Sequence, residues 1–198
     1  ALEDDYQRIQ SRMFMMYGVE DSSNLYFATA ANKIGNGLDE QLEYFMREHP
    51  DTKLIIIDTL QKIREAGGDK YSYANDYEVV GKLKRLADDC GVCLLLVHHT
   101  RKQQADDKFD MISGTNGLLG AADAGFVLLR SKRDQSNATL HCTGRDIESR
   151  EIDLNFNKDT CTWTLISDSM KEPMLLLPKE MAALIEFMRE TVSFSVTN

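Results

Sequence analysis

Polar side chains follow two apolar segments of the chain, at the point where each segment ends. Leu54 to Ile57 are four apolar residues in a row, and the carboxylate of Asp58 and the hydroxyl of Thr59 come directly after them. A carboxylate at the end of a rigid strand can hold the Mg²⁺ that bridges the β- and γ-phosphates of a nucleotide. A carboxylate in this position can also cap the turn that follows. Both interpretations are open at this point.

Two histidines, His98 and His99, follow the second apolar segment, residues 92–97. Their imidazoles could hydrogen-bond a γ-phosphate, or one could be exposed and the other packed, without a chemical role. Zinc is a weaker interpretation, because no third and fourth ligand stand at suitable spacing. Cys90 and Cys93 have the spacing of a redox pair, but a helical pattern ends at Cys90 instead of starting there, which favours buried or half-buried structural thiols.

Three more features could contribute to a site. Glu3 follows what resembles the end of a strand and could orient an attacking water, or it is a carboxylate placed favourably at a helix start. The glycine-rich segment 113–123 could move between sites, or it is an ordinary turn. Arg145 ends a strand, where its guanidinium could reach the phosphates of a neighbouring subunit, or it could pair with Asp146 or Glu148 on the surface.

Length and composition limit the classes of protein. A chain of 198 residues with 42% hydrophobic content predicts one well-cored domain. The opening residues do not resemble a secretory leader, and no apolar stretch approaches the ~20 residues of a membrane helix, so we expect a soluble, cytoplasmic protein without a membrane partner. The net charge of −9 argues against coating DNA by bulk electrostatics, although local basic loops remain possible. Four cysteines are too few for a disulfide scaffold.

The order of helical and apolar segments predicts an α/β fold. Three helices are expected, over residues 4–17, from Leu38 to His49 and over 76–90, and three strands at 24–30, 53–58 and 92–97. The last two strands are apolar without alternation, which predicts parallel strands buried on both faces.

Four further strands follow in close succession, at 125–130, 138–144, 150–156 and 161–166, and the short turns between them predict antiparallel pairing. The expected fold is therefore a three-layer sheet whose parallel core strands continue into antiparallel edge strands, with ligands beyond the carboxyl ends of the strands. Residues 1–167 would form this core, and residues 168–198 a linker and the start of a C-terminal helical segment.

These segments together resemble the RecA-like AAA family ATPases of the P-loop NTPase superfamily, related to the hexameric replicative helicase RepA and commonly encoded by phages and mobile elements. The resemblance rests on ALED, LIIIDTLQK, LLLVHHTRK, SGTNGLLGAADAGFVL and LHCTGRDIE, in this order, and covers roughly residues 1–166. It implies a RecA-like three-layer sheet, ATP and Mg²⁺ as cofactors, single-stranded DNA as a partner and a hexamer-like homo-oligomer in the parent protein.

The resemblance also implies a role for each polar residue at the expected site. Asp58 would be the Walker B carboxylate that holds Mg²⁺, with Thr59 beside it at the nucleotide. Glu3 would be the catalytic carboxylate. His99, with His98 as the alternative, would sense the γ-phosphate.

Two further roles lie outside this group. Arg145 would be the arginine finger that acts across a subunit boundary. The loop 101–117 would face a central channel, where it could contact a DNA strand through Arg101, Lys102 and Lys108.

The phosphate-binding loop G-x-x-x-x-G-K-[ST] of this family is missing from the sequence. Gly81-Lys82 is the only Gly-Lys pair, but it lies inside the expected helix 76–90 and is followed by Leu83. We therefore expect that the loop would precede Ala1. Because the loop's backbone N–H groups and lysine supply most of the binding energy for the triphosphate, the 198-residue chain alone should bind ATP weakly or not at all.

Three function hypotheses follow. The first is part of an ATP-hydrolysing motor or loader that acts on DNA in replication or recombination of a phage or mobile element. The second is a non-catalytic DNA-binding or assembly module that retains the fold. The third, a metal-dependent hydrolase using Asp58, His98 and His99, is weaker because further well-spaced ligands are missing.

Overall fold

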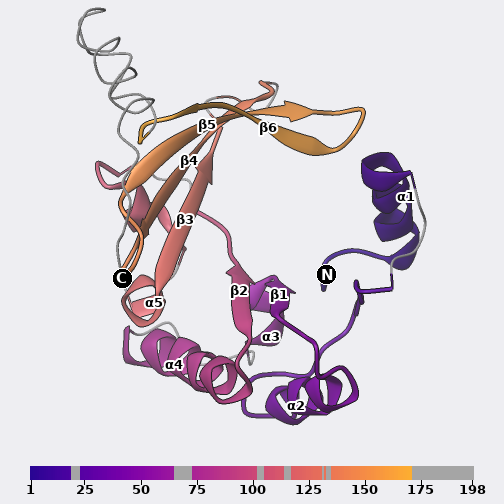
Figure 1. Cartoon of the computed structure of the whole chain (residues 1–198). Helices are drawn as coiled ribbons and strands as arrows, with labels where there is room; N and C mark the ends of the chain where they lie inside the picture. Colours follow the sequence, from indigo (N-terminus) through magenta and orange to yellow (C-terminus); the bar gives the residue numbers. More distant parts are fainter. Residues whose placement is uncertain are drawn as a thin grey trace, which may run out of the picture.

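The computed structural model describes residues 1–18, 23–64, 73–101, 105–113, 117–130, 132 and 135–170. The helices are α1 (Tyr6–Tyr17), α2 (Leu38–Glu48), α3 (Leu60–Ile63), α4 (Tyr73–Cys90), the 3₁₀ helix η1 (Lys108–Met111) and α5 (Gly117–Ala121). The strands are β1 (Leu54–Asp58), β2 (Cys93–Val97), β3 (Ala124–Leu129), β4 (Asn137–Gly144), β5 (Arg150–Asn157) and β6 (Thr162–Asp168). Figure 1 shows β1 and β2 next to α2 and α4, and the other four strands as a second sheet.

The strands β1 and β2 form a parallel pair. Their register runs from Leu54 opposite Cys93 to Asp58 opposite Val97. This confirms that the two apolar segments are neighbouring parallel strands. It also places the carboxyl ends of both strands, with Asp58 and the two histidines, at one edge of the small sheet.

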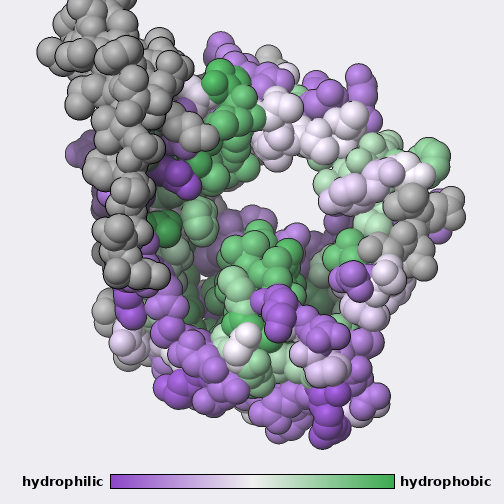
Figure 2. Space-filling view, viewed as in Figure 1, coloured by the Kyte–Doolittle hydropathy of each residue, from purple (hydrophilic) through white to green (hydrophobic). Residues whose placement is uncertain are grey.

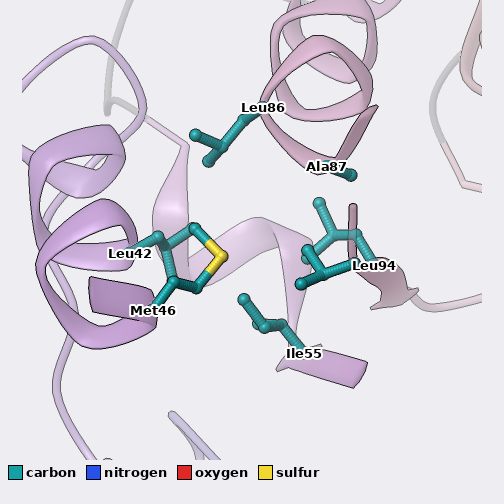
Figure 3. Close-up of a pocket in the computed structure, with 7 residues that line it drawn as sticks. Leu42, Met46, Ile55, Leu86, Ala87 and Leu94 are labelled. Atoms are coloured by element: carbon teal, nitrogen blue, oxygen red, sulfur yellow. The ribbon is translucent and has the colours of Figure 1, made fainter. Parts of the chain in front are cut away.

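One face of this parallel pair is covered by α2 and α4. The covered face and the two helices meet in an apolar pocket, shown in Figure 3, which is lined by Leu42, Met46, Ile55, Leu86, Ala87, Val92 and Leu94. Ile57, Leu60, Ile63 and Leu83 are among the buried residues of the same core. Burial of these side chains is the main force that holds the helices on the sheet.

The other face of β1 and β2 is open in the part of the chain that the structure describes. Ile56 is 52% exposed and Leu95 40%, and Leu54 and Val97 on the same face are also exposed. Figure 2 shows a hydrophobic area, in green, in the middle of the view, where Figure 1 draws β1 and β2. The prediction that both strands are buried on both faces was therefore wrong, because successive side chains point to opposite faces and the described helices cover only one.

The strands β3 to β6 form an antiparallel sheet in sequence order, which confirms the predicted antiparallel pairing. This sheet is separate from the β1–β2 pair, so the prediction of one sheet that runs from parallel core strands into antiparallel edge strands was wrong for the described residues. A Cβ on Gly125 would lie 2.4 Å from Leu119 of α5 and 3.5 Å from Phe109 of η1, so these elements pack closely at the start of the strand.

Two N-terminal expectations also need correction. Residues 24–30 do not form a strand. Tyr26 instead packs with its ring against Phe45 and His49, at centroid distances of 5.5 and 4.2 Å. The opening residues, expected to be the end of a strand before Glu3, instead form a turn before α1. Asp5 accepts a hydrogen bond from the amide of Arg8 at 2.8 Å and caps this helix.

At the other end of the described chain, β6 extends to Asp168. The linker and C-terminal helical segment expected from there on lie, from residue 171, outside the described residues. None of the described helices is both long and apolar enough to cross a membrane.

Candidate functional site

The carboxyl end of β1 joins the opening segment of the chain. The amide of Leu2 donates to the carbonyl of Asp58 at 2.6 Å. Thr59 is 2% exposed, and its hydroxyl donates to Oε1 of Glu3 at 3.2 Å. The structure thus brings together three of the predicted residues, Glu3, Asp58 and Thr59.

The position of Asp58 relative to α3 shows whether its carboxylate caps this helix. The N-cap position of α3 is occupied by Thr59, not by Asp58, so the alternative in which Asp58 caps the following helix does not hold. The peptide bond between the two residues is cis. Asp58 is half-buried at the edge where a ligand of a parallel sheet is expected.

The two predicted histidines differ in their surroundings. His98 is half-buried, and its Nδ1 atom is buried without a hydrogen-bond partner in the described structure. His99 is exposed, and its carbonyl accepts a hydrogen bond from the amide of Ser113 at 2.9 Å. The two rings are 6.4 Å apart. His98 follows Val97, which is the register partner of Asp58.

A buried ion pair lies near His98. Nη2 of Arg64 contacts Oδ1 of Asp76 at 2.7 Å, and Asp76 is 0% exposed. The pKa of His98 is lowered, first by burial and then by Arg64 and His99, against the opposing effects of the Ser113 backbone and Asp76. A neutral imidazole keeps one N–H donor and one bare nitrogen that can accept a hydrogen bond. The sequence did not indicate this ion pair, because its partners lie on either side of a segment with no periodic pattern.

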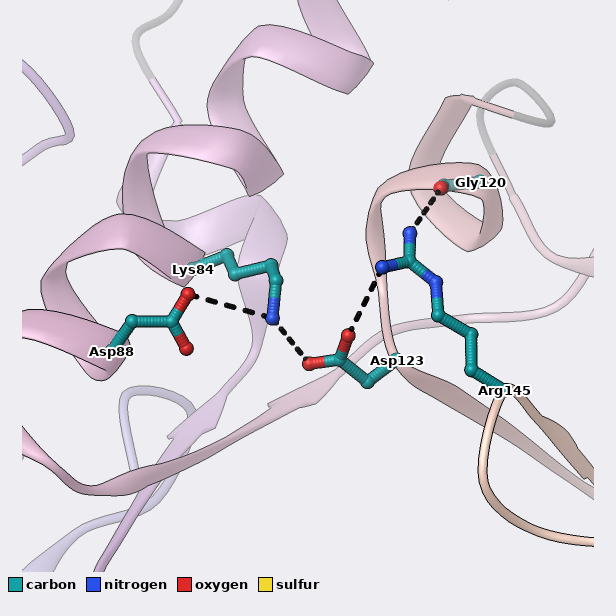
Figure 4. A network of polar contacts seen from close by, with 5 residues as sticks. All are labelled: Lys84, Asp88, Gly120, Asp123 and Arg145. Carbon is teal, nitrogen blue, oxygen red and sulfur yellow. Dashed lines mark hydrogen bonds and ion pairs between the residues drawn. The ribbon is translucent and has the colours of Figure 1, made fainter.

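Arg145 belongs to a different polar network, shown in Figure 4. Its guanidinium contacts Oδ1 of Asp123 and the carbonyl of Gly120, both at 3.4 Å, and its amide donates to the Asp123 carbonyl at 2.9 Å. Asp123 also accepts a hydrogen bond from Nζ of Lys84 at 2.6 Å, and Lys84 contacts Asp88 at 3.5 Å. The described partner of Arg145 is therefore Asp123, directly before β3, and not Asp146 or Glu148.

This network shifts the pKa values of Asp123 and Lys84. The hydrogen bond from Lys84 is the largest cause of the lowered pKa of Asp123, and Arg145 adds to it. The same bond raises the pKa of Lys84. Sequence reasoning missed both residues. Asp123 ends the glycine-rich segment and precedes a strand, a position that resembled a turn, and Lys84 is one of many charges on a helix surface.

The predicted DNA-contacting residues lie in a short loop after β2. The amide of Arg101 donates to the Met111 carbonyl at 2.6 Å, which closes the base of the loop, and the Arg101 side chain is exposed. Lys108 is half-buried at the start of η1 and donates to the Ala105 carbonyl at 3.3 Å. Lys102 lies outside the described residues, as do residues 114–116 of the glycine-rich segment. Three aspartates accompany Lys108 in this loop, Asp106, Asp107 and Asp110.

Among the residues that the structure describes, no three or more His, Cys, Asp or Glu side chains gather closely enough to hold a metal ion by themselves. Mg²⁺ keeps several waters and is held by one or two carboxylates together with phosphate oxygens, so a nucleotide-bound Mg²⁺ would not need such a cluster. Asp58, the predicted carboxylate for this ion, is half-buried at the carboxyl end of β1. The thiols of Cys90 and Cys93 are free and exposed, so the prediction that they are buried or half-buried was wrong. Cys93 pairs with Leu54 on the open face of the β1–β2 pair, which the described helices do not cover.

Comparison with known proteins gives two findings. A family model described as "AAA domain" matches residues 1–105. Among solved structures, the chain is similar to "The Structure Of A DnaB-Like Replicative Helicase And Its Interactions With Primase", with a TM-score of 0.57 and 19% sequence identity, over 71% of this chain and 36% of that chain. No curated protein matches. The structural likeness shows the fold, and the chain spans little more than a third of that helicase chain.

Proposed function

Because this chain belongs to the AAA domain family, we propose that it is part of a RecA-like, ATP-hydrolysing motor or loader that acts on DNA in replication or recombination of a phage or mobile element. The observation that carries the proposal is the edge at which β1 and β2 end together. There Asp58 lies opposite Val97, immediately before His98, and Thr59 is hydrogen-bonded to Glu3.

Each group at this edge has a chemical role in the proposal. Asp58 would hold Mg²⁺ through its water shell, and the ion, when bound with ATP, supplies charge stabilisation for the phosphates. Glu3 would orient the attacking water, and the Thr59 hydroxyl would fix the carboxylate that does so. His99, or the more enclosed His98, would hydrogen-bond near the γ-phosphate.

Arg145 is proposed to act in a neighbouring copy. Its side chain is 57% exposed at the end of β4, and its bonds to Asp123 and Gly120 are both long, at 3.4 Å. A guanidinium held this loosely can exchange a carboxylate for a phosphate of a neighbouring subunit. The proposal therefore includes a hexamer-like homo-oligomer of the parent protein.

The phosphate-binding loop remains the missing part of the proposed machinery. The sequence contains no G-x-x-x-x-G-K-[ST] segment, and we propose that this loop precedes Ala1 in the parent. The 198-residue chain alone should then bind ATP weakly or not at all.

The experiment compares this chain with a version extended upstream along its coding sequence. Calorimetric titration with Mg-ATP should show tight binding only for the extended chain. In the extended chain, Glu3→Gln should retain ATP binding and lose most hydrolysis, by about 10²-fold or more. The matched control is Glu148→Gln, which changes an exposed carboxylate in the turn after β4 and should leave hydrolysis unchanged. Micromolar ATP binding by the 198-residue chain itself would contradict the proposal.

A second candidate is a non-catalytic DNA-binding or assembly module that retained the fold. It is favoured by the absence of the phosphate-binding loop from the sequence. The coding sequence upstream of Ala1 separates the two. A glycine-rich segment ending in Gly-Lys-Ser or Gly-Lys-Thr supports the ATPase, and a start codon close to Ala1 supports the module.

A further inference from the structure

An arginine and two aromatic rings meet at one end of the four-stranded sheet. Phe156 of β5 and Trp163 of β6 are register partners, with ring centroids 5.0 Å apart. Cζ of Arg130, the residue after β3, lies 4.9 Å from the Trp163 centroid and 5.4 Å from the Phe156 centroid. We call these three residues the Arg130 cluster.

The sheet itself explains how a side chain from β3 reaches rings on β5 and β6. Leu129 pairs with Thr139, so Arg130 comes level with Ala138 on β4, and Ala138 pairs with Leu154 on β5. Ala138 is small and buried, and it leaves room for the arginine side chain to pass over β4. The guanidinium then lies against both rings, as cations do on aromatic faces.

The Arg130 cluster is accessible and its surroundings are basic. Arg130 is exposed, and the two rings are half-buried. Two connections lie at this end of the sheet, one after β3 and one after β5. Their described residues include two more exposed cations, Lys132 and Lys158, and one acid, Asp159. The loop of Lys108, by contrast, holds three aspartates.

We propose that the Arg130 cluster binds single-stranded DNA, with one base stacked on the exposed guanidinium and rings and with Lys132 and Lys158 at the flanking phosphates. Planar guanidinium and aromatic groups are the usual surfaces on which unpaired bases stack, and such stacking tolerates any base sequence. Duplex DNA should bind less tightly, because its bases are already stacked on one another. The choice of DNA as ligand rests on the proposed function, but the site differs from the predicted loop contacts.

Trp163 makes this site directly observable. It is the only tryptophan of the chain, so its fluorescence reports on the cluster alone. Titration of the full chain with a short oligo-dT at low salt should quench this fluorescence in a saturable way, and added salt should weaken the binding. Arg130→Ala should weaken binding about tenfold, as measured by the anisotropy of a labelled oligonucleotide.

The chain offers a matched control for this variant. Arg47 of α2 lies over the ring of Tyr44 at 5.2 Å, the same kind of contact in another part of the fold. Arg47→Ala should therefore leave oligo-dT binding unchanged, and circular dichroism checks that both variants are folded.

Variants of the loop after β2 separate this inference from the proposed function. If Arg101→Ala and Lys108→Ala abolish binding while Arg130→Ala leaves it unchanged, the Arg130 cluster is not the DNA-binding site. DNA would still be the ligand, bound by the loop after β2. An absence of any Trp163 response or anisotropy change in the unmodified chain also overturns the inference, whereas the ATP experiment tests the proposed function independently. Equal binding of duplex and single strand would contradict the stacking geometry.

Discussion

At the scale of single residues, the ion pair of Arg64 and Asp76 sets the environment of the candidate site. Both side chains are buried within reach of His98, and Asp76 is fully enclosed. A carboxylate in such a place is tolerated because a guanidinium compensates it, and removing one partner leaves an uncompensated charge. Loss of either partner should therefore destabilise the fold around His98.

Asp76→Ala is expected to lower the free energy of unfolding by about 3–5 kcal/mol, because Arg64 then remains buried without its carboxylate. Urea denaturation followed by circular dichroism measures the change. The control is Lys82→Ala, which removes an exposed pair with Glu78 on the same helix and should cost about 0.5 kcal/mol or less. Equal shifts of the two urea midpoints would show that the buried pair has no special role.

The lowered pKa of His98 predicts a dependence of stability on pH. Since burial keeps the folded pKa below the ordinary value of 6.5, the unfolded chain binds this proton more readily than the folded chain. The free energy of unfolding should therefore fall as pH drops through 6.5 toward the folded pKa, and this contribution is fully present above 6.5. NMR titration of the imidazole measures the folded value directly.

The variant for this prediction is His98→Gln, which should flatten the pH dependence in that window. His99→Gln serves as its control, because His99 is exposed. A His98 ring that titrates above 6.5 would contradict the prediction.

The sequence located some of these residues and not others, for a physical reason. Asp58 and His98 could be found because each ends an apolar run, and strand ends are visible in a linear pattern. The bond between Thr59 and Glu3 and the bond between Arg145 and Asp123 join residues 56 and 22 positions apart. Such pairings depend on tertiary packing, which no local spacing encodes.

At the scale of elements, the two faces of the β1–β2 pair differ in solvent exposure although both carry apolar residues. Ile55 and Ile57 face α2 and α4, whereas Ile56 is 52% exposed. The sequence predicted the strands, their order and their parallel pairing, because a continuous apolar run is typical of parallel strands. It could not predict which face the helices cover, since both faces carry the same residue types.

Neighbouring isoleucines in β1 test this difference. Ile57→Ala should lower the free energy of unfolding by about 2–5 kcal/mol, because it leaves a cavity under the helices. Ile56→Ala removes the same atoms from the open face and should cost about 1 kcal/mol or less. Urea denaturation of both variants gives the comparison, and equal losses would mean that another element covers the open face in solution.

At the scale of the whole molecule, the described contacts between the two sheets are carried by helices and by polar groups rather than by strand pairing. The segment 24–30 and the separate sheets show the limit of sequence reasoning at this scale. A strand needs a partner with free backbone groups, and whether one is within reach is a property of the complete fold. Lys84 on α4 and Arg145 after β4 meet at Asp123, before β3, and so connect the helical side to the antiparallel sheet.

Asp123→Asn should loosen this connection, because the amide cannot hold two cations as the carboxylate does. We expect faster amide hydrogen exchange at the start of β3 and in the turn after β4, around residues 144–149, with little change inside the β1–β2 pair. High salt should produce part of the same effect in the unmodified chain, since exposed ion pairs are screened. The matched control is Asp88→Asn, which removes a carboxylate that contacts Lys84 at 3.5 Å but is not bonded to Arg145. Hydrogen exchange that is equally fast in the two variants would mean that Asp123 does not join the sheet to the helix, and that Arg145 is positioned by its own turn alone.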